Sequence, residues 1–178
     1  ASGQDADGSV QNRKKQENRK KPALLMVLET IQDPGNLGTI LRAGEGAGVT
    51  GVVMDANTTD IYNPKVIRST MGSVLRMPFV YVEDLHETLQ ELKNRNIRLF
   101  AAHLKGKQAY DLEDYTGDTA FLIGNEGNGL TDETAAMADT YVRIPMEGSV
   151  ESLNAAVAAS VLMFEAARQR RNSQQGNN

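Results

Sequence analysis

The feature that most constrains this chain is the alternation of short, continuously apolar runs with segments of helical patterning. The first run, Ala23–Leu28, has no polar position, which is typical of a strand covered on both faces. Further strands are predicted at Gly51–Met54, Phe79–Val82, Ile97–Ala101, Ala120–Ile123 and Tyr141–Ile144. Strands that alternate with helices form a largely parallel sheet flanked by helices. We therefore predict an α/β fold.

Turn and capping residues mark the helices between these strands. Asp33–Asn36 is a turn sequence, and we expect Asn36 to cap a helix over Leu37–Ala47. Asn63 is the expected cap of a second helix, with Pro64 at its first position. The remaining predicted helices cover Asp84–Asn94, a short segment that begins at Thr131-Asp132-Glu133, and Ser152–Arg168 with Ser152 as its cap.

The two ends of the chain differ from this middle part. Residues 1–21 are rich in Gly, Gln, Asn and charged side chains, which predicts a disordered basic tail or an interdomain linker. Because the chain begins without a methionine, an N-terminal domain ahead of this segment stays open as an alternative. Residues 173–178 are polar and are expected to fray. The folded domain is expected to cover residues 22–172.

The charge of the chain is unevenly distributed. Residues 11–21 hold six Lys or Arg against a single Glu, while the rest of the chain has 13 basic and 22 acidic residues. A uniformly basic nucleic-acid binder has a different balance, so a polyanion has to be met by local patches. The candidates are the basic tail and a cluster near the other end, Arg168, Arg170 and Arg171. For the tail by itself, a solvated segment that only aids solubility is the simpler interpretation.

Composition excludes several classes of protein. Hydrophobic residues make up 40% of 178 residues, which is enough for a substantial core and excludes wholesale disorder. No apolar run approaches the ~20 residues of a membrane-spanning helix, and no signal peptide is recognisable. Without cysteine there is no disulfide framework or thiol nucleophile, and neither His86 nor His103 has a second ligand at a metal spacing. We expect a cytoplasmic protein without a metal.

Two loops that follow predicted strands are candidates for a ligand site. Gly124–Gly129 comes directly after the most apolar strand, where parallel α/β proteins bind ligands, although an ordinary tight turn has the same composition. Ile144–Asn154 also leaves a strand and places Ser152 and Asn154 at a helix entry. A helix cap explains Ser152, but it does not explain Asn154 in the first turn. Gly44–Gly48 lacks the spacing of a dinucleotide loop, and its small residues favour close helix packing.

The last predicted helix begins with an unusually apolar stretch. Leu153–Phe164 has almost no polar face, and a helix that is apolar all round is buried on several sides. In a chain of this length we expect one of those sides to contact a partner subunit. If Ala159 faces the partner, a charged substitution there is expected to weaken the dimer and the activity together.

Three segments together carry a family signature. They are Asn36–Val49 (NLGTILRAGEGAGV), Phe121–Leu130 (FLIGNEGNGL) and Arg143–Val157 (RIPMEGSVESLNAAV). In this order and spacing they resemble the three motifs of the SpoU-type RNA 2′-O-methyltransferases of the SPOUT superfamily. The resemblance covers residues 22–170, which is nearly all of the predicted folded domain.

This resemblance implies a fold and a cofactor that periodicity does not reveal. The SPOUT fold is an α/β domain with a mostly parallel sheet and a deep trefoil knot in its C-terminal part, which cradles S-adenosylmethionine. It also implies a homodimer. The cofactor-binding residues that it implies are Ala102, His103, Leu104, Ile123, Gly124, Asn125, Glu126, Gly127, Ile144, Pro145, Met146, Ser152, Leu153 and Asn154. Among these, backbone groups of Gly124, Ile144 and Leu153 are expected to hold the adenosine part.

The resemblance also implies a catalytic set, which consists of Arg42, Asn36, Glu126, Ser152 and Asn154. Removing a proton from a guanidinium is very costly, so we expect Arg42 to clamp an RNA phosphate and to stabilise the forming alkoxide. The proton of the ribose hydroxyl then passes to Glu126 or to water, and this choice stays open. A surface arginine without a catalytic role is the alternative for Arg42.

The linker-like start of the chain bears on the substrate. Relatives with an N-terminal RNA-binding domain, a linker and then this domain modify large-subunit rRNA, whereas tRNA-directed relatives tend to carry helical extensions at both ends. We therefore expect 23S rRNA as the substrate in preference to tRNA. A tRNA 2′-O-methyltransferase and a catalytically silent RNA-binding module of the same fold are the alternatives.

Overall fold

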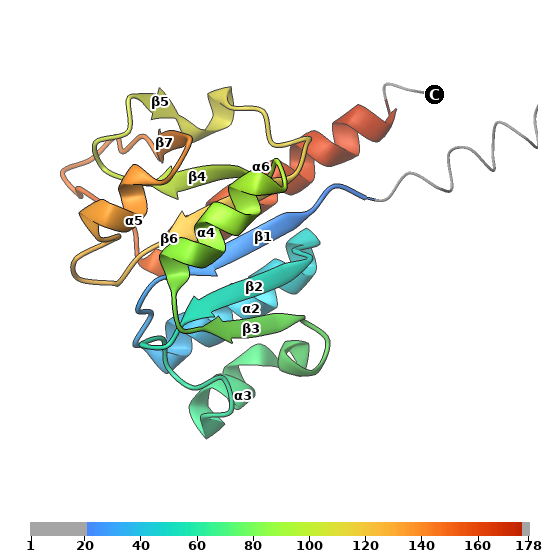
Figure 1. Ribbon diagram of the computed structural model, residues 1–178, viewed down its shortest axis with the longest axis vertical. Coiled ribbons are helices and arrows are strands. Elements are labelled where there is room, and N and C mark those ends of the chain that lie inside the picture. Colours follow the sequence, from blue (N-terminus) through green and yellow to red (C-terminus); the bar gives the residue numbers. More distant parts are fainter. Residues whose placement is uncertain (1–20, 176–178) are drawn as a thin grey trace, which may run out of the picture.

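A computed structural model describes residues 21–175, and residues 1–20 and 176–178 lie outside the described part. The predicted basic tail or linker, 1–21, therefore falls almost wholly outside it. The described residues form a seven-stranded parallel sheet in the order β3-β2-β1-β6-β4-β7-β5 (Figure 1). Its strands are β1 (Leu24–Leu28), β2 (Gly51–Asp55), β3 (Phe79–Val82), β4 (Arg98–Ala102), β5 (Gln108–Ala109), β6 (Thr119–Ile123) and β7 (Thr140–Arg143).

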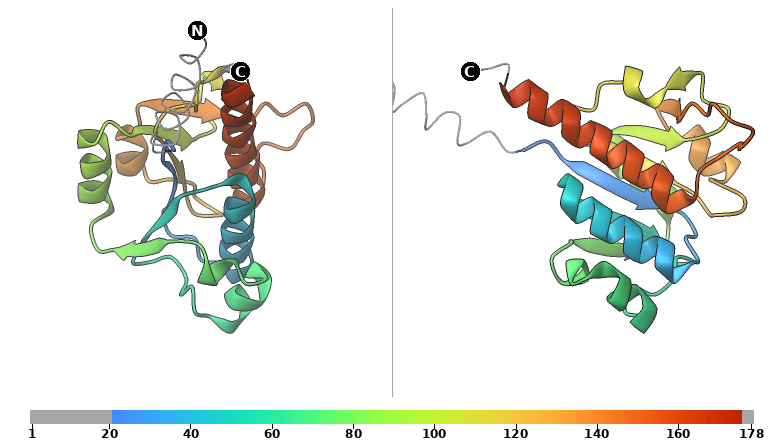
Figure 2. Two further views of the ribbon diagram at one scale, coloured as in Figure 1. Left: turned by 90° about the vertical axis from the view of Figure 1, so that its right-hand side faces the viewer. Right: turned by 180° about the vertical axis from the view of Figure 1, so that it is seen from behind.

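Helices cover both faces of this sheet. They are α2 (Pro34–Ala47), α3 (Pro64–Thr70), α4 (Leu85–Asn94), α5 (Asp132–Ala136) and α6 (Ala155–Gln175), with short 3₁₀ turns η1 (Ser73–Leu75) and η2 (Tyr110–Leu112). Figure 2 shows α2 and α6 side by side on one face, and α4 and α5 on the other. The predicted parallel α/β fold is confirmed. Strand β5 is missing from the prediction because two residues are too short to produce a pattern.

The alternating directions of strand side chains divide the core into two layers. On β1, Leu24, Met26 and Leu28 pack in the layer under α2 and α6, whereas Val27 packs in the layer under α4. These four side chains are at most 1% exposed, which is why the run contains no polar residue. The largest fully buried side chains include Phe100, Tyr115 and Phe121, whose rings contact one another.

Two helix starts differ from the prediction. Asp33, not Asn36, caps α2, because its Oδ1 accepts from Asn36 N at 2.8 Å and the helix begins at Pro34. Proline needs no hydrogen-bond partner at that position, so the cap moves upstream of it. Ser152 does not cap α6, since the Asn154 side chain accepts from the backbone N–H groups of the first turn. The predicted cap of α3, Asn63, is confirmed. The predicted start of α5 is also confirmed, and Thr131 is its cap.

The small residues of α2 allow close packing, as expected. A Cβ atom on Gly38 would lie 1.6 Å from the hydroxyl oxygen of Ser69, so α2 and α3 touch there. A Cβ on Gly46 would lie 3.6 Å from the ring of Phe164 on α6. The buried side of α6 packs within its own chain, and Ala159 is fully buried in it. The condition for the Ala159 prediction is therefore not met, because Ala159 does not face a partner.

Helix α6 continues to Gln175, beyond its predicted end at Arg168, so residues 173–175 of the expected frayed end are helical. Arg170 explains this extension, because its guanidinium donates to four carbonyl oxygens, those of Pro22, Ala23, Tyr115 and Gly117. Partial burial lowers the pKa of Arg170 below its ordinary value. Arg168 forms an ion pair with Glu165, at 2.7 Å between Nη2 and Oε1. The predicted arginine patch is thus largely engaged within the fold.

Two further findings concern only residues 21–175. No helix in this range is long and apolar enough to span a lipid bilayer. Within the same range, no group of three or more His, Cys, Asp or Glu side chains is placed to hold a metal ion.

We expect Arg170→Ala to lower the free energy of unfolding by about 2–4 kcal/mol, because it leaves several carbonyl groups without their charged donor. The matched control is Arg171→Ala. It removes the same charge from the same helix, but the side chain of Arg171 is exposed. Its effect should stay within about 0.5 kcal/mol. Urea unfolding followed by circular dichroism measures both, and equal losses would contradict this role for Arg170.

Candidate functional site

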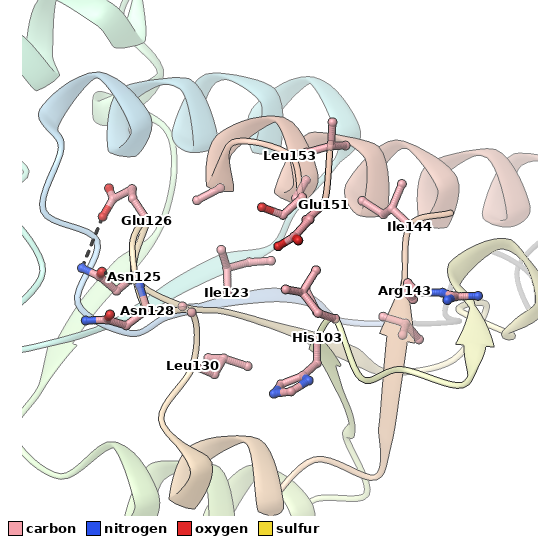
Figure 3. Close-up of a pocket in the computed structure, with 18 of the residues that line it drawn as sticks. His103, Ile123, Asn125, Glu126, Asn128, Leu130, Arg143, Ile144, Glu151 and Leu153 are labelled. Carbon is pink, nitrogen blue, oxygen red and sulfur yellow. Dashed lines mark hydrogen bonds between the residues drawn. The ribbon is translucent and has the colours of Figure 1, made fainter. Parts of the chain in front are cut away.

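The candidate site lies at the carboxyl edge of the sheet, where β4, β6 and β7 end. The loops that leave these strands enclose a cavity of about 330 Å³ (Figure 3). Strand β1 pairs with β2 on one side and β6 on the other, and the connections reverse direction there. In open α/β sheets such a switch point is where ligands bind.

Most of the predicted cofactor-binding residues line this one cavity. They are Ala102, His103, Leu104, Ile123, Gly124, Asn125, Glu126, Gly127, Ile144, Met146, Ser152 and Leu153. Pro145 and Asn154 belong to the same loop but do not line the cavity, and neither do Asn36 and Arg42. The structure therefore brings together residues from three separate loops. Of the predicted catalytic residues, Glu126 and Ser152 line the cavity, whereas Asn36, Arg42 and Asn154 do not.

The glycine-rich loop 124–130 has a shape that its own contacts fix. Asn125 and Gly129 exchange two backbone hydrogen bonds, at 3.1 and 2.9 Å between N and O. The Oδ1 atom of Asn125 also accepts from Gly127 N at 2.9 Å. A Cβ atom on Gly124 would lie 2.1 Å from the backbone of Gly129 and Leu130, so only glycine fits there. The loop is preformed.

Glu126 joins this loop to the start of α2. Its carboxylate accepts from the backbone N–H of Asp33 at 3.0 Å and from Asn36 Nδ2 at 3.1 Å. The Oδ1 atom of Asn36 in turn accepts from Asn154 Nδ2 at 3.0 Å. These three side chains, one from each motif, therefore form a continuous hydrogen-bonded chain beside the cavity.

The donors around Glu126 also set its protonation. Partial burial acts to raise the pKa of Glu126, but hydrogen bonds from the backbone and from Asn36 outweigh it and hold that pKa below its ordinary value. Gln32 N contributes a further, longer contact at 3.3 Å. A carboxylate that is stabilised in its charged form is a weak base. Its role here is to position the loops.

Two buried acids that sequence analysis did not single out support the site from behind. Asp55, at the end of β2, accepts from the backbone N and the hydroxyl of Thr30, both at 2.8 Å, and from Thr58 Oγ1 at 2.7 Å. These bonds hold Thr30 at φ 56°, a left-handed conformation that β-branched residues rarely adopt. Asn125 Nδ2 then donates to the carbonyl of Thr30 at 2.9 Å. Asp55 thus supports the loop through Thr30.

Glu29, at the end of β1, does the same for the start of α5. It is 8% exposed and accepts from Thr131 N and Thr131 Oγ1 at 2.8 and 2.9 Å, and from the hydroxyl of Thr134. Because Thr131 follows the glycine-rich loop directly, Glu29 fixes the exit of that loop. An acid at the end of an apolar strand was the only available signal for Glu29 and Asp55.

The opposite wall of the cavity has a different character. Within residues 21–175, no hydrogen bond joins segment 146–153 to the rest of the chain, so its polar backbone groups are available to a ligand or to water. Apolar side chains surround them, including Ile123, Ile144 and Leu153. His103 stacks on Tyr141 at the rim, with 4.9 Å between ring centroids. Such a cavity suits a flat, partly apolar ligand that bonds to backbone groups.

Arg42 lies apart from the cavity. Its side chain is exposed on α2, one turn after Gly38, where α2 contacts α3. Among the described residues it has no hydrogen-bond or ion-pair partner. Arg42 is therefore free to bind an external anion, and it does not contact the cavity in this chain alone.

The fold and site define a ligand-binding α/β domain of the parallel, doubly wound class, with its cavity built by the loops after β4, β6 and β7. The model of the SpoU rRNA methylase family matches residues 23–164. The chain belongs to this family, and the expectation drawn from its three motifs is confirmed.

Curated relatives and solved structures share this domain. The 23S rRNA (guanosine-2′-O-)-methyltransferase RlmB of Xylella fastidiosa (strain 9a5c) is 38% identical over 148 residues, which is 83% of this chain and 59% of the relative. The crystal structure of the SpoU methyltransferase AviRb from Streptomyces viridochromogenes in complex with the cofactor AdoMet has a TM-score of 0.80 and 34% identity, covering 85% of this chain and 59% of that one. The TrmH/SpoU tRNA modifying enzyme of A. aeolicus has a TM-score of 0.78 and 26% identity, covering 96% and 88%.

The chain thus spans less than two thirds of the curated relatives that it matches, such as the Xylella protein, at 59% of its length.

We expect Glu126→Gln to destabilise the fold above about pH 5 and to matter progressively less as the pH falls. The folded-state pKa of Glu126 is lowered, so its contribution is fully present above the unfolded value of about 4.3 and is lost as the pH falls through the folded value. Urea midpoints of both proteins between pH 3 and pH 7 measure this gap.

The matched control is Glu91→Gln on the exposed surface of α4. It should leave stability within about 0.5 kcal/mol across the range. A gap between wild type and Glu126→Gln that widens towards acid pH would contradict the bonded carboxylate.

Proposed function

We propose that this chain is the catalytic domain of an S-adenosylmethionine-dependent methyltransferase that acts on a ribose 2′-hydroxyl of large-subunit (23S) rRNA. The observation that carries the proposal is that the second and third family motifs line one cavity, and that hydrogen bonds among Asn36, Glu126 and Asn154 tie the first motif to them. The names of the Xylella relative and of the AdoMet-bound AviRb structure support the same activity.

The residues around the cavity fit S-adenosylmethionine. The preformed loop at Gly124 and the unbonded backbone of 146–153 offer donors and acceptors, and Ile123, Ile144 and Leu153 offer apolar walls for an adenosine group. The volume of about 330 Å³ is at the small end of the range for cofactor sites, and the cavity is open on one side. When bound, the cofactor supplies a methyl group that its sulfonium activates.

The chain's own residues then have three roles. Ser152 and the glycine-rich loop bind the cofactor. The hydrogen bond between Asn36 and Asn154 fixes the start of α2 relative to the loop before α6. Arg42 binds an RNA phosphate and stabilises the charge that develops on the ribose oxygen. Because the oxygens of Glu126 are occupied by N–H donors, the proton of the hydroxyl leaves to water. Much of the acceleration comes from alignment of the two reactants.

The preference for rRNA over tRNA follows the degree of similarity. The relative named for 23S rRNA is 38% identical, whereas the neighbour named as a tRNA modifying enzyme is 26% identical. A cytoplasmic location follows from the same proposal, because bacterial relatives of this kind meet their rRNA there. The catalytically silent module is the second candidate, and the exposed Arg42 is the observation that disfavours it.

We also propose that the C-terminal part is tied in a trefoil knot, as the family resemblance implies. The strand order is compatible with it, since β6 is inserted between β1 and β4 and the chain then returns to the outer side of β4 as β7. The loop 144–154 that follows β7 comes back to the cavity beside loop 124–130.

We propose a homodimer through the outer face of α6. Val157 and Phe164 lie two turns apart on one face of this helix, and each is 47% exposed. Gly46 of α2 adjoins Phe164, so the apolar surface continues onto the neighbouring helix. A two-fold pair of such surfaces buries apolar area on both copies.

The protein should bind S-adenosylmethionine in calorimetry and methylate fragments of 23S rRNA at ribose, detected as alkali-resistant linkages. Arg42→Ala should bind the cofactor as the wild type does, because Arg42 lies outside the cavity. Its turnover should fall about 10²–10³-fold, the usual cost of losing one group that stabilises developing charge. Arg42→Lys should recover little, since a point charge does not replace the planar fork.

Two outcomes would contradict this assignment. A wild type that fails to bind the cofactor at high concentration rejects the cofactor, and faster methylation of tRNA than of 23S rRNA rejects the substrate. If Arg42→Ala kept full turnover but lost cofactor binding, the assignment of Arg42 to the RNA side would be wrong.

For the dimer, we expect Phe164→Glu to convert the protein to a monomer, because burying an unpaired carboxylate in an apolar interface is costly. Light scattering at micromolar concentration measures the mass. Val80→Glu is the control, since Val80 on β3 is 48% exposed and lies away from α6. A folded wild type that is already monomeric would contradict the dimer.

A further inference from the structure

Two carboxylates line the cavity, and they differ in their surroundings. Glu126 is occupied by N–H donors from the loop and from α2. Glu151, which precedes the motif serine, lines the cavity from the opposite loop. In the described part of the chain Glu151 has no hydrogen bond and no ion pair. Figure 3 draws its carboxylate pointing into the cavity.

The basic residues of the cavity form no ion pair with Glu151. Arg143 and Lys105 both contribute to the lining, but neither lies within 4.0 Å of the Glu151 carboxylate. In Figure 3 the guanidinium of Arg143 points away from the cavity, towards β5. Glu151 also lines a second hollow of about 440 Å³, which shares Arg143 with the cavity. The Glu151 carboxylate therefore has no ion-pair partner in the described part of the chain.

We propose that Glu151 is a specificity-determining residue that favours S-adenosylmethionine over S-adenosylhomocysteine by charge. The inference rests on the proposed function, because it concerns the cofactor of that reaction. The two ligands share their adenosine and amino-acid parts, and they differ in a methyl group and in the permanent positive charge on sulfur. An unpaired carboxylate beside apolar walls attracts the cationic ligand, whereas it has no comparable attraction for a neutral thioether.

This discrimination changes the balance between binding and release. Transfer of the methyl group removes the positive charge on sulfur, so the attraction of Glu151 ends with the reaction. The by-product is then held only by the contacts that both ligands share. Because Glu151 is exposed to solvent, its effect is screened and the expected preference is modest, roughly three- to tenfold.

Calorimetric titration of the whole chain with each ligand tests the proposal. The wild type should bind S-adenosylmethionine more tightly than S-adenosylhomocysteine. Glu151→Gln should reduce the ratio of the two dissociation constants roughly three- to tenfold, by weakening the cationic ligand alone. Raising the salt from 50 to 500 mM should reduce the wild-type ratio in the same direction and leave that of the variant nearly unchanged.

The matched control is Glu147→Gln. Glu147 lies on the same loop and carries the same charge, but it lines neither hollow. The ratio of the two dissociation constants of Glu147→Gln should therefore equal that of the wild type. Thermal melts of both variants verify that the loop substitution leaves the fold intact, and Glu151→Ser provides a second neutral residue. An unchanged ratio in both Glu151 variants would overturn the inference while leaving the proposed function standing. Failure of the wild type to bind either ligand would overturn the proposed cofactor, and this inference with it.

Discussion

One carboxylate connects the parts of this molecule that matter most for its function. Glu126 leaves the loop after β6 and accepts from the backbone at the start of α2 and from Asn36, which is bonded to Asn154 before α6. These segments are some 90 to 120 residues apart in sequence, so no local preference brings them together. Hydrogen bonds to a charged acceptor are stronger than those between neutral groups, and they also fix direction. The cavity depends on this junction, because it holds two of the walls.

Carboxylates that accept hydrogen bonds from distant loops also lie at the ends of β1 and β2. Glu29 and Asp55 are almost fully buried, and burial of a carboxylate is costly unless donors surround it. Each has such donors, from Thr131 and Thr134 in one case and from Thr30 and Thr58 in the other. Acids at the carboxyl ends of strands thus bind the backbone of loops that leave neighbouring strands. The loops after β1 and β6 are held in this way, so this edge of the sheet is already shaped.

The sequence was sufficient for every strand except β5, because the inner positions of the central strands are buried on both faces and are therefore apolar. It was insufficient for the helix starts, where Asn36 and Ser152 had the right chemistry but Asp33 and Asn154 had the right position. A cap depends on which residue has extended backbone angles, and several polar neighbours compete for that place. Ala159 shows the same limit, since an alanine-rich helix does not reveal which side its own sheet covers. The roles of Glu29 and Asp55 were not predicted, because the residues that donate to them are distant in the sequence.

The charged residues of the domain differ in whether they are free to bind an external anion. Most of the chain is acidic, and of the C-terminal arginines Arg170 is committed to four carbonyl groups and Arg168 to Glu165. Lys65 and Arg68 on α3, in contrast, are exposed, and the contact between Gly38 and Ser69 holds α3 against the helix that carries Arg42. Arg42 does not line the cavity, so under the proposed function an RNA strand bound at this basic surface contacts residues other than those that line the cofactor cavity. The proposed function therefore assigns the polyanion to the exposed basic residues of α2 and α3, and the cofactor to the cavity at the carboxyl edge of the sheet.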